Sequence, residues 1–353
     1  MLNNNSVKVV KQLAKKIIAR VIFSLGLFYF FHKGKTVILM YHRVLPNREL
    51  VKPHFQSALI VSDKDFEQNI ICLKKYYEII SLPQYLELRA RNTWSPNKRY
   101  AIITLDDGWE DNYQFAAPLV TRQNVSASIF LATGFIDSEK TFWWQAIGDS
   151  LLTAVKNTHQ LVALAKLFKD YNINYETPHH LLNKREAEII DYINGLIVEL
   201  KNLPPQKLTL FSQDCLEVVA LKIFPKAMTW QQVIELDNQG FCFGPHSVNH
   251  SILTTLDDEQ ARCEIIESQK QLASHHLKNT LNIFCYPNGT YDSKIKQWVK
   301  EIGFEAALST KNGRTSFTDD LYSLPRINIS QATSRSALLF KFKLLYIKRG
   351  NAQ

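Results

Sequence analysis

Short apolar segments that alternate with amphipathic helical segments constrain the fold of this chain most. Apolar runs predict strands at residues 36–44, 100–107, 127–133, 239–247, 281–287, 305–310 and 321–329. Helical patterns occur between them at residues 66–77, 112–123, 257–276 and 294–303, and Ser62 reads as the N-cap of the first helix. Alternation of this kind indicates an α/β protein with a parallel sheet, and the number of units suggests a barrel-like closure.

A long segment at about residues 140–236 breaks this alternation. It is mostly helical in pattern, with polar stretches and few strand signals, and we interpret it as an insertion between two barrel strands. A chain of 353 residues, 46% of them hydrophobic, is long enough for one α/β barrel with such an insertion. We therefore expect a barrel domain at residues 36–330, preceded by an N-terminal segment at 1–35 and followed by a tail at 331–353.

Basic residues are concentrated at the N-terminus. Nine of the 42 Lys and Arg residues but none of the 33 Asp and Glu residues precede residue 49, so the rest of the chain carries 33 charges of each sign. On a helix, one face would hold Lys8, Lys11 and Lys15, and another face would hold Val10, Leu13, Ile17 and Val21. The pattern of residues 1–35 therefore predicts a basic amphipathic helix that lies on a membrane surface.

This interpretation would place the protein in the cytoplasm, peripheral at the inner membrane. An uncleaved N-terminal signal anchor and an ordinary packed helix remain the alternatives for the same segment. Residues 338–350 share its apolar and basic character and would dock beside it. The balanced charge of the remaining chain, without any recognition motif, argues against binding of nucleic acid. The five cysteines are scattered and lack a CxxC pair, which excludes a disulfide framework and weakly favours a reducing compartment.

Two adjacent carboxylates, Asp106 and Asp107, end the predicted strand at residues 100–107. Two like charges this close cost stability unless a cation lies beside them. His246 and His250 lie four residues apart just beyond another strand, and two imidazoles with one carboxylate form a catalytic zinc site with an open fourth position. Either motif alone is often a turn, a helix cap or chance, but both end strands of one α/β series. One aspartate would bind the metal and the other would act as a base on water.

Three motifs lie at the ends of strands of this series: TLDDG at residues 104–108, HSVNH at 246–250 and FCYPNG at 284–289. Together they resemble the motifs of the polysaccharide deacetylase family, also called the NodB-homology domain or carbohydrate esterase family 4. The resemblance covers roughly residues 36–136 and 236–330. It implies a distorted (β/α)7 barrel and a metal-dependent hydrolase that removes acetyl groups from N-acetylated sugars. Location at a membrane would favour a lipid-linked sugar or a glycan precursor as the substrate.

The resemblance also implies roles for individual residues. Asp106 would be the general base, and the metal ligands would be Asp107, His246 and His250. The metal would most simply be Zn²⁺, although such a site also accepts Co²⁺, Ni²⁺ or Fe²⁺. FCYPNG would form a wall of the substrate groove, which includes Tyr286, and the backbone N–H of Asn288 would help to hold the oxyanion.

The chain departs from the family pattern at three places. Leu105 stands where the family usually has Phe, which is a conservative change. Cys285 stands where many members have an Arg that pairs with the base, and Arg326 is our candidate for that partner, unless it is a surface or helix-end arginine. The late strand that ends in a catalytic His is missing, but VILMYH at residues 37–42 resembles it, as in permuted members. On this reading His42 is the general acid that protonates the leaving amine; otherwise it is a hydrogen-bonded histidine of the rim.

Aromatic residues beside these motifs suggest how the pocket is lined. Tyr41 and Trp109 flank the proposed catalytic groups, and we expect them to contribute to the substrate pocket. The aromatic run at residues 142–144 would form either a platform for sugar rings or, more simply, a buried cluster that anchors the insertion. Asp292 would cap the helix that follows it.

Two other functions remain open from the sequence. One is a related hydrolase that acts on another amide or on an O-acetyl ester. The other is a non-catalytic scaffold that binds carbohydrate or a lipid carrier in a degenerate pocket, for which the missing arginine of the third motif is the support.

Overall fold

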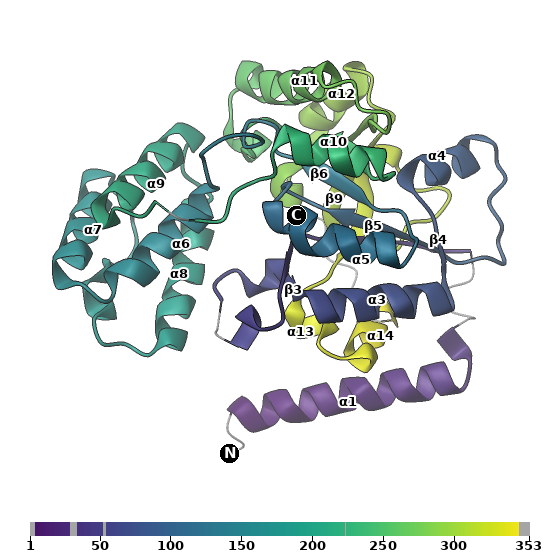
Figure 1. Cartoon of the computed structure of the whole chain (residues 1–353), viewed down its shortest axis with the longest axis horizontal. Coiled ribbons are helices and arrows are strands. Elements are labelled where there is room, and N and C mark those ends of the chain that lie inside the picture. The colour runs from purple at the N-terminus through teal and green to yellow at the C-terminus, as the bar shows by residue number, and fades with distance from the viewer. Residues whose placement is uncertain (1–3, 29–33, 52–53, 223, 346–353) are drawn as a thin grey trace.

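The computed structural model describes residues 4–28, 34–51, 54–222 and 224–345, and its centre is a parallel sheet curled into a nearly closed barrel (Figure 1). The order of the seven barrel strands is β7-β6-β5-β1-β10-β9-β8. Their bounds are β1 Thr36–Tyr41, β5 Tyr100–Leu105, β6 Ser128–Leu131, β7 Cys242–Pro245, β8 Ile283–Cys285, β9 Ala306–Asn312 and β10 Leu324–Asn328. The predicted (β/α)7 barrel is confirmed.

Two backbone hydrogen bonds join β7 to the segment just before β8 and so nearly close the barrel. The N–H of Phe243 donates to the carbonyl of Asn279 at 3.0 Å, and the N–H of Leu281 donates to the carbonyl of Phe243 at 2.7 Å. The first strand of the chain, β1, lies between β5 and the last strand, β10. The N-terminal strand therefore brings the residue that follows it to the centre of the sheet edge.

Helices cover the outside of the barrel, and two of them begin at the predicted caps. They are α3 Asp63–Tyr76, α4 Leu82–Ala90, α5 Ala117–Arg122, α10 Trp230–Asn238, α11 Asp258–Ser274 and α12 Ser293–Glu301. Ser62 accepts a hydrogen bond from the N–H of Asp65 at the start of α3, and Asp292 accepts one from the N–H of Ile295 at the start of α12. Two short strands, β2 Arg43–Leu45 and β3 Ile60–Ser62, pair separately, and β4 Glu78–Ile79 pairs with β5.

Four helices form a separate lobe beside the barrel, at the left of Figure 1. They are α6 Trp143–Ala154, α7 Thr158–Asp170, α8 Glu186–Leu200 and α9 Pro205–Val219. This lobe buries its own apolar cluster, which includes Leu164, Ile193 and Phe211. The following helix, α10, packs on the barrel core through Val233 and Leu236. The helical insertion is therefore present, and its own core extends from α6 to α9.

The N-terminal and C-terminal helices of the described residues pack together on the side of α3 (Figure 1). The N-terminal helix α1, Asn4–Ser24, contacts the C-terminal helix α14, Ala337–Leu345. The ammonium of Lys341 lies 4.8 Å from the ring centre of Phe23. The predicted docking of the C-terminal segment beside the N-terminal helix is thus confirmed for the described part, whereas residues 346–350 lie outside it. Among the described helices, none combines the length and apolar character that crossing a membrane requires.

Candidate active site

The residues predicted to carry the chemistry meet in one pocket at the C-terminal ends of the barrel strands. His42 follows β1, Asp106 and Asp107 follow β5, and His246 follows β7. The helical lobe forms the other side of the pocket. The pocket is lined by His42, Gln56, Leu59, Asp106, Asp107, Trp143, Trp144, Ile197, Lys201, His246, His250, Ile252, Tyr286, Asn288 and Thr310.

Asp107 and the two histidines converge on one small volume. The Oδ1 atom of Asp107 lies 3.5 Å from Nε2 of His246 and 3.2 Å from Nε2 of His250. Each of the three side chains offers one ligand atom, and these atoms all lie within 4.8 Å of one another. Asp107 has a positive φ of 75°, a backbone strain for a residue other than glycine, and such strain is found mainly at functional sites.

The surroundings of Asp107 leave one of its oxygens for a cation. Trp109 donates from Nε1 to Oδ2 at 2.9 Å. Oδ1 is buried, and no donor among the described residues makes a hydrogen bond of normal geometry to it. A buried carboxylate oxygen of this kind, facing two imidazole nitrogens, fits a divalent metal with two nitrogen ligands and one oxygen ligand.

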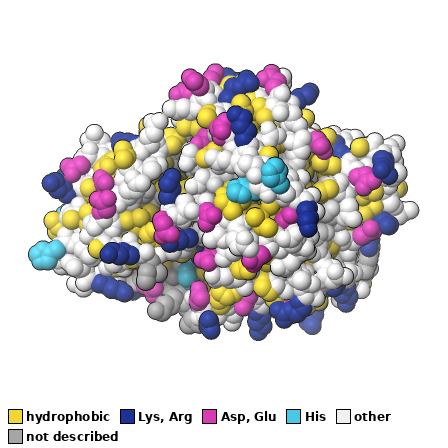
Figure 2. All heavy atoms as spheres, turned by 45° about the horizontal axis from the view of Figure 1, so that its top comes forward, with side chains coloured by type: hydrophobic (Ala, Val, Ile, Leu, Met, Phe, Trp, Pro, Cys, Tyr) yellow, Lys and Arg dark blue, Asp and Glu magenta, His cyan; other side chains and the backbone are white. Residues whose placement is uncertain are grey.

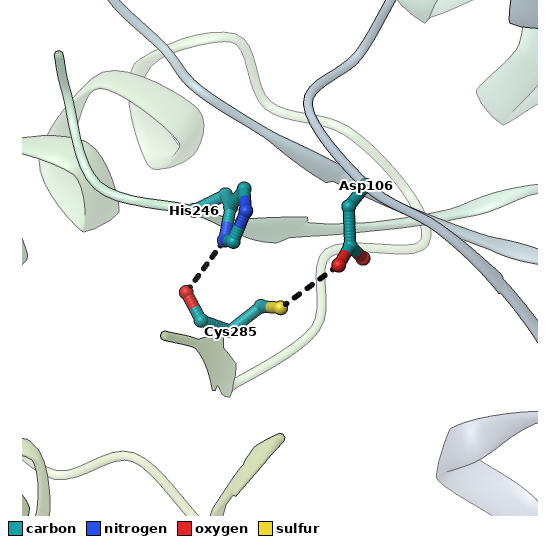
Figure 3. Close-up of side chains that lie close together, drawn as sticks. All are labelled: Asp106, His246 and Cys285. Atoms are coloured by element: carbon teal, nitrogen blue, oxygen red, sulfur yellow. Dashed lines mark hydrogen bonds between the residues drawn. The ribbon is translucent and has the colours of Figure 1, made fainter. Parts of the chain in front are cut away.

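Both histidines are held by contacts behind the site. Nδ1 of His246 donates to the carbonyl of Cys285 at 2.7 Å (Figure 3). This contact directs Nε2 toward Asp107. The loop before His250 is fixed by Glu264, whose Oε2 accepts from the backbone N–H groups of Val248 and Asn249 at 2.9 and 2.8 Å. No sequence pattern indicates Glu264, because nothing in the sequence places this residue of α11 beside the loop.

The electrostatics of this group favour a positive charge between its members. Burial raises the pKa of the Asp107 carboxyl, but His250 and His246 outweigh burial and hold it well below its usual value. Burial lowers the pKa of His246, but its contacts with Cys285 and Asp107 raise it well above the usual value. Since the Cys285 thiol is itself buried and its own pKa is raised, we attribute the direction for His246 to Asp107. A proton and a metal ion therefore compete for the same place.

The second aspartate, Asp106, is paired with Arg326, as we expected. Nη1 and Nη2 of Arg326 donate to Oδ1 and Oδ2 of Asp106 at 2.7 Å each, and its Nε donates to the carbonyl of Ser309 at 3.0 Å. Burial raises the pKa of Asp106, but the charge and hydrogen bonds of Arg326 outweigh it, so that the pKa is lowered. Asp106 is therefore held ionised and in one orientation.

The side chain of Cys285 contacts both members of the Asp106–Arg326 pair. Its Sγ is 3.2 Å from Nη2 of Arg326 and 3.7 Å from Oδ2 of Asp106 (Figure 3). Arg326 extends from β10 and occupies the interior of the barrel with 0% exposure. The alternative that Arg326 is a surface arginine is excluded, and so is the argument that the base lacks an arginine partner.

His42 lies on the open side of Asp106. Its Nε2 is 4.0 Å from Oδ2 of Asp106, and its backbone carbonyl accepts a hydrogen bond of 2.7 Å from Nδ2 of Asn112. Burial lowers the pKa of His42 more than Asp107 and Asp106 raise it. The His42 side chain forms no hydrogen bond through Nδ1 to any described residue, so the structure gives it no role in holding the rim.

Four residues were expected around the substrate, and two of them are not among the described residues that line the pocket. Tyr41 is buried in the core and packs edge-on against Phe66, because the alternation along β1 points it away from His42. Trp109 is also buried and lies behind Asp107 as its hydrogen-bond donor. Both expectations about pocket lining are therefore corrected.

The other two, Tyr286 and Asn288, do line the pocket. Tyr286 is buried, and its hydroxyl donates to the carbonyl of Tyr322 at 3.1 Å. Asn288 has a positive φ of 55°, and its carbonyl accepts from the hydroxyl of Thr310 at 3.2 Å. These contacts hold the FCYPNG segment as a wall of the pocket.

The aromatic run at the start of the helical lobe is divided between a buried anchor and the wall of the pocket. Phe142 is buried and stacks on Phe135 with ring centres 4.3 Å apart, which anchors the lobe to the barrel. Trp143 and Trp144 reach the pocket, and the ring centre of Trp144 is 4.8 Å from that of His250. The lobe therefore forms part of the pocket wall.

Arg43 is a further residue of the site that no sequence pattern indicates. Its guanidinium lies 4.6 Å from the ring centre of Trp109, and its Nε donates to Asp111 at 2.8 Å. It thus supports the tryptophan that holds Asp107. The sequence does not reveal this role, because it does not show toward which residues the side chain of Arg43 points.

Comparisons with known proteins agree with this geometry. Residues 94–307, more than half of the chain, match the sequence model described as polysaccharide deacetylase. The protein YxkH of Bacillus subtilis (strain 168) is 22% identical over 304 residues, which cover 86% of this chain and 75% of YxkH. The matched model begins after β1, so it does not include the strand that carries His42.

Solved structures of deacetylases share the fold. The Streptococcus pyogenes deacetylase PplD, solved in complex with acetate, has a TM-score of 0.54 at 19% identity and covers 87% of this chain and 98% of PplD. IcaB from Ammonifex degensii has a TM-score of 0.51 at 14% identity and covers 88% of this chain and 97% of IcaB. With the sequence-model match and a barrel that carries the family motifs at its strand ends, the chain belongs to the polysaccharide deacetylase family and is a sugar deacetylase.

Proposed function

We propose that this protein removes an N-acetyl group from an amino sugar of a glycan or a lipid-linked glycan precursor by metal-dependent hydrolysis. The products are acetate and a free amine. The observation that carries the proposal is the convergence of Asp107, His246 and His250 in one pocket that Asp106 also lines, with Arg326 paired to Asp106 from the barrel interior.

Asp107, His246 and His250 would hold the metal. The donor set suits Zn²⁺ best, and Co²⁺, Ni²⁺ or Fe²⁺ would also be accepted. When bound, such an ion lowers the pKa of water and polarises the acetyl carbonyl. Trp109 and the Cys285 carbonyl keep two of the ligands in place.

Asp106 would act as the general base. Its carboxylate lies beside the metal ligands but is not needed as one, since Arg326 neutralises it. In this role Asp106 accepts the proton of the attacking water as the oxygen adds to the acetyl carbon. Arg326 acts as a positioning residue that fixes the two oxygens of the base.

His42 would act as the general acid. Its imidazolium gives a proton from Nε2 to the sugar nitrogen while the carbon–nitrogen bond breaks. The lowered pKa makes that imidazolium a stronger acid than usual. Asp106 gains one proton and His42 loses one, and proton exchange with solvent restores both groups, because the 4.0 Å between His42 Nε2 and Asp106 Oδ2 is longer than a hydrogen bond.

The backbone N–H of Asn288 would stabilise the negative oxygen that forms on the acetyl carbon. The positive φ of Asn288 and the bond from Thr310 to its carbonyl fix this peptide group at the pocket wall. Fixed donors of this kind stabilise developing charge because they need no reorganisation during the reaction.

The proposal also places the enzyme at the cytoplasmic face of the inner membrane. The outer face of α1 exposes Leu13, Ile17 and Val21 by 57%, 54% and 48%, and Lys11, Lys15 and Arg20 are exposed next to them. Lys and Arg side chains gather along the lower edge of the face seen in Figure 2, whereas the signs are mixed elsewhere on it. A surface that is both apolar and basic suits an anionic lipid bilayer.

Acetate release tests the proposed reaction. Purified protein loaded with Zn²⁺ is assayed with free, oligomeric and lipid-linked N-acetylhexosamines, and with O-acetyl esters of the same sugars. We expect acetate from at least one amide, loss of activity with a chelator, and a loss of at least about 100-fold in Asp106→Asn. Metal-loaded protein that releases acetate only from esters, or from no sugar, would overturn the proposal.

A further inference from the structure

Lys201 is the one Lys or Arg among the described residues that line the pocket. It is the C-cap residue of α8, so the helical lobe contributes it and the barrel does not. Its side chain is half-buried, and burial lowers the pKa of its ammonium. The lobe therefore brings a positive charge to a pocket whose catalytic residues all come from the barrel.

The contacts of Lys201 leave most of its donors free. Nζ donates to Oδ1 of Asn288 at 2.7 Å, and no carboxylate of the described residues lies within the 4.0 Å of an ion pair. An ammonium group has three N–H donors, so a neutral amide oxygen uses one of them. A cation withdrawn from water in this way gains most from an anion that arrives with a ligand.

The carboxylates of the pocket cannot serve as that anion. Asp106 is bound to Arg326 on both oxygens, and Asp107 faces His246 and His250. The remaining lining near Lys201 in the lobe is apolar, with Trp143, Trp144 and Ile197. The pocket thus combines an apolar wall, which suits a sugar ring, with one cation that has no anion of its own.

We propose that Lys201 recognises an anionic group, a phosphate or a carboxylate, that the acetylated amino sugar carries in addition to its acetamido group. The inference rests on the proposed deacetylase function and deepens it by naming the substrate class. The Lys201–Asn288 contact places the ammonium of Lys201 next to the peptide group that would hold the oxyanion. The pocket would therefore bind the anionic group and the acetyl group of one substrate at the same time.

Substrate pairs that differ in charge test this assignment. Initial rates are compared for N-acetylglucosamine 1-phosphate, N-acetylmuramic acid and the neutral methyl N-acetylglucosaminide. We expect Lys201→Gln to raise KM for an anionic substrate about tenfold or more, which corresponds to a lost charge-assisted hydrogen bond, and to change KM for the neutral one less than about twofold. Lys166→Gln, an exposed lysine of α7 outside the pocket, is the matched control and should change neither.

Asn288→Gly separates recognition of an anion from support of the pocket wall. It removes the side-chain partner of Lys201 but retains the backbone N–H and the positive φ. We expect this variant to keep the preference for anionic substrates. If Lys201→Gln lowers kcat equally for charged and neutral substrates, Lys201 only supports the wall and the inference is wrong.

A binding measurement keeps the test independent of turnover. Glucosamine 1-phosphate and glucosamine are titrated into the metal-loaded protein by calorimetry. We expect the phosphate to bind at least about tenfold more tightly to the wild type than to Lys201→Gln, and glucosamine to bind both equally. If the wild type and Lys201→Gln bind glucosamine 1-phosphate equally, the inference about Lys201 is wrong and the deacetylase proposal is unaffected. If the two proteins differ in phosphate binding but the wild type releases no acetate, the deacetylase proposal alone is wrong.

Discussion

Arg326 holds Asp106 through two hydrogen bonds of 2.7 Å each, although the two residues are 220 positions apart in the sequence. The pair connects β10 with the end of β5, and β1 lies between these two strands. Cys285 lies at the end of β8 beside this pair, and the cation that balances Asp106 comes from another strand, β10.

Replacing Arg326 by Met should damage both stability and activity. The change leaves Asp106 buried without its cation, and we expect a loss of about 3–5 kcal/mol in the free energy of unfolding. The pKa of Asp106 should rise, so the acidic limb of the kcat/KM profile should move to higher pH. Arg326→Lys, which keeps the charge without the two-pronged contact, should show smaller changes.

The same variant should change the dependence of stability on pH. Arg326 lowers the pKa of Asp106 in the folded protein, so this contribution is present above the unfolded pKa of about 4 and is lost as pH falls through the folded pKa. Urea unfolding of the wild type and Arg326→Met should therefore differ most near neutral pH and converge in acid. An unfolding difference that grows as pH falls would contradict this account.

Trp109→Phe should weaken metal binding. The variant keeps most of the buried aromatic surface but removes the donor to Oδ2 of Asp107. Loss of such support for a ligand typically lowers metal affinity about 10–100-fold, which competition with a chromophoric chelator measures. Trp94→Phe is the control, because its Nε1 donates to the carbonyl of Gly34 and its ring packs with Tyr85 and Tyr100. Equal metal affinity of both variants and the wild type would show that Asp107 needs no such support.

The thiols should divide into one reactive and four protected groups. All five cysteines are free, and Cys263 is exposed. Burial raises the pKa of the Cys72 and Cys242 thiols to about 11 and also raises that of Cys285. Ellman's reagent at pH 8 should modify one thiol rapidly in the folded protein and none rapidly in Cys263→Ser. Rapid reaction of a second thiol would mean that the barrel interior opens.

Binding to anionic vesicles should depend on the apolar face of α1. The double variant Leu13→Glu with Ile17→Glu places charges on that face and should lower co-sedimentation with phosphatidylglycerol vesicles at least about tenfold. The control pair Val198→Glu with Leu210→Glu changes equally exposed positions on the helical lobe, at 64% and 55% exposure. If both double variants bind vesicles as the wild type does, the membrane does not contact α1.

The sequence predicted the centre of the site well because each key residue follows a strand. The C-terminal ends of parallel strands meet at one edge, so His42, Asp106 and His246 were expected there. Tyr41 was misplaced because adjacent residues of β1 point to opposite sides, and the sequence alone does not say which side faces the barrel mouth.

Other features depended on packing that no local pattern reports. Lys201 and Trp144 reach the pocket only because the helical lobe folds against the barrel, which its helical periodicity does not specify. Helix α4 was missed although its start carried a signal, since Ser81 and Gln84 form a capping box around Pro83. The capping box therefore predicts α4 from the sequence, whereas the position of the lobe against the barrel is seen only in the structure.

The metal site is tested by titration of the metal-free protein with Zn²⁺, when bound metal and acetate release are measured in the same samples. We expect both to rise together and to saturate at one ion per chain, and we expect His250→Ala, which removes one ligand, to lower the metal affinity and the activity together. Full acetate release from protein without bound metal, or unchanged metal affinity in His250→Ala, would contradict the assignment of Asp107, His246 and His250 as the metal site.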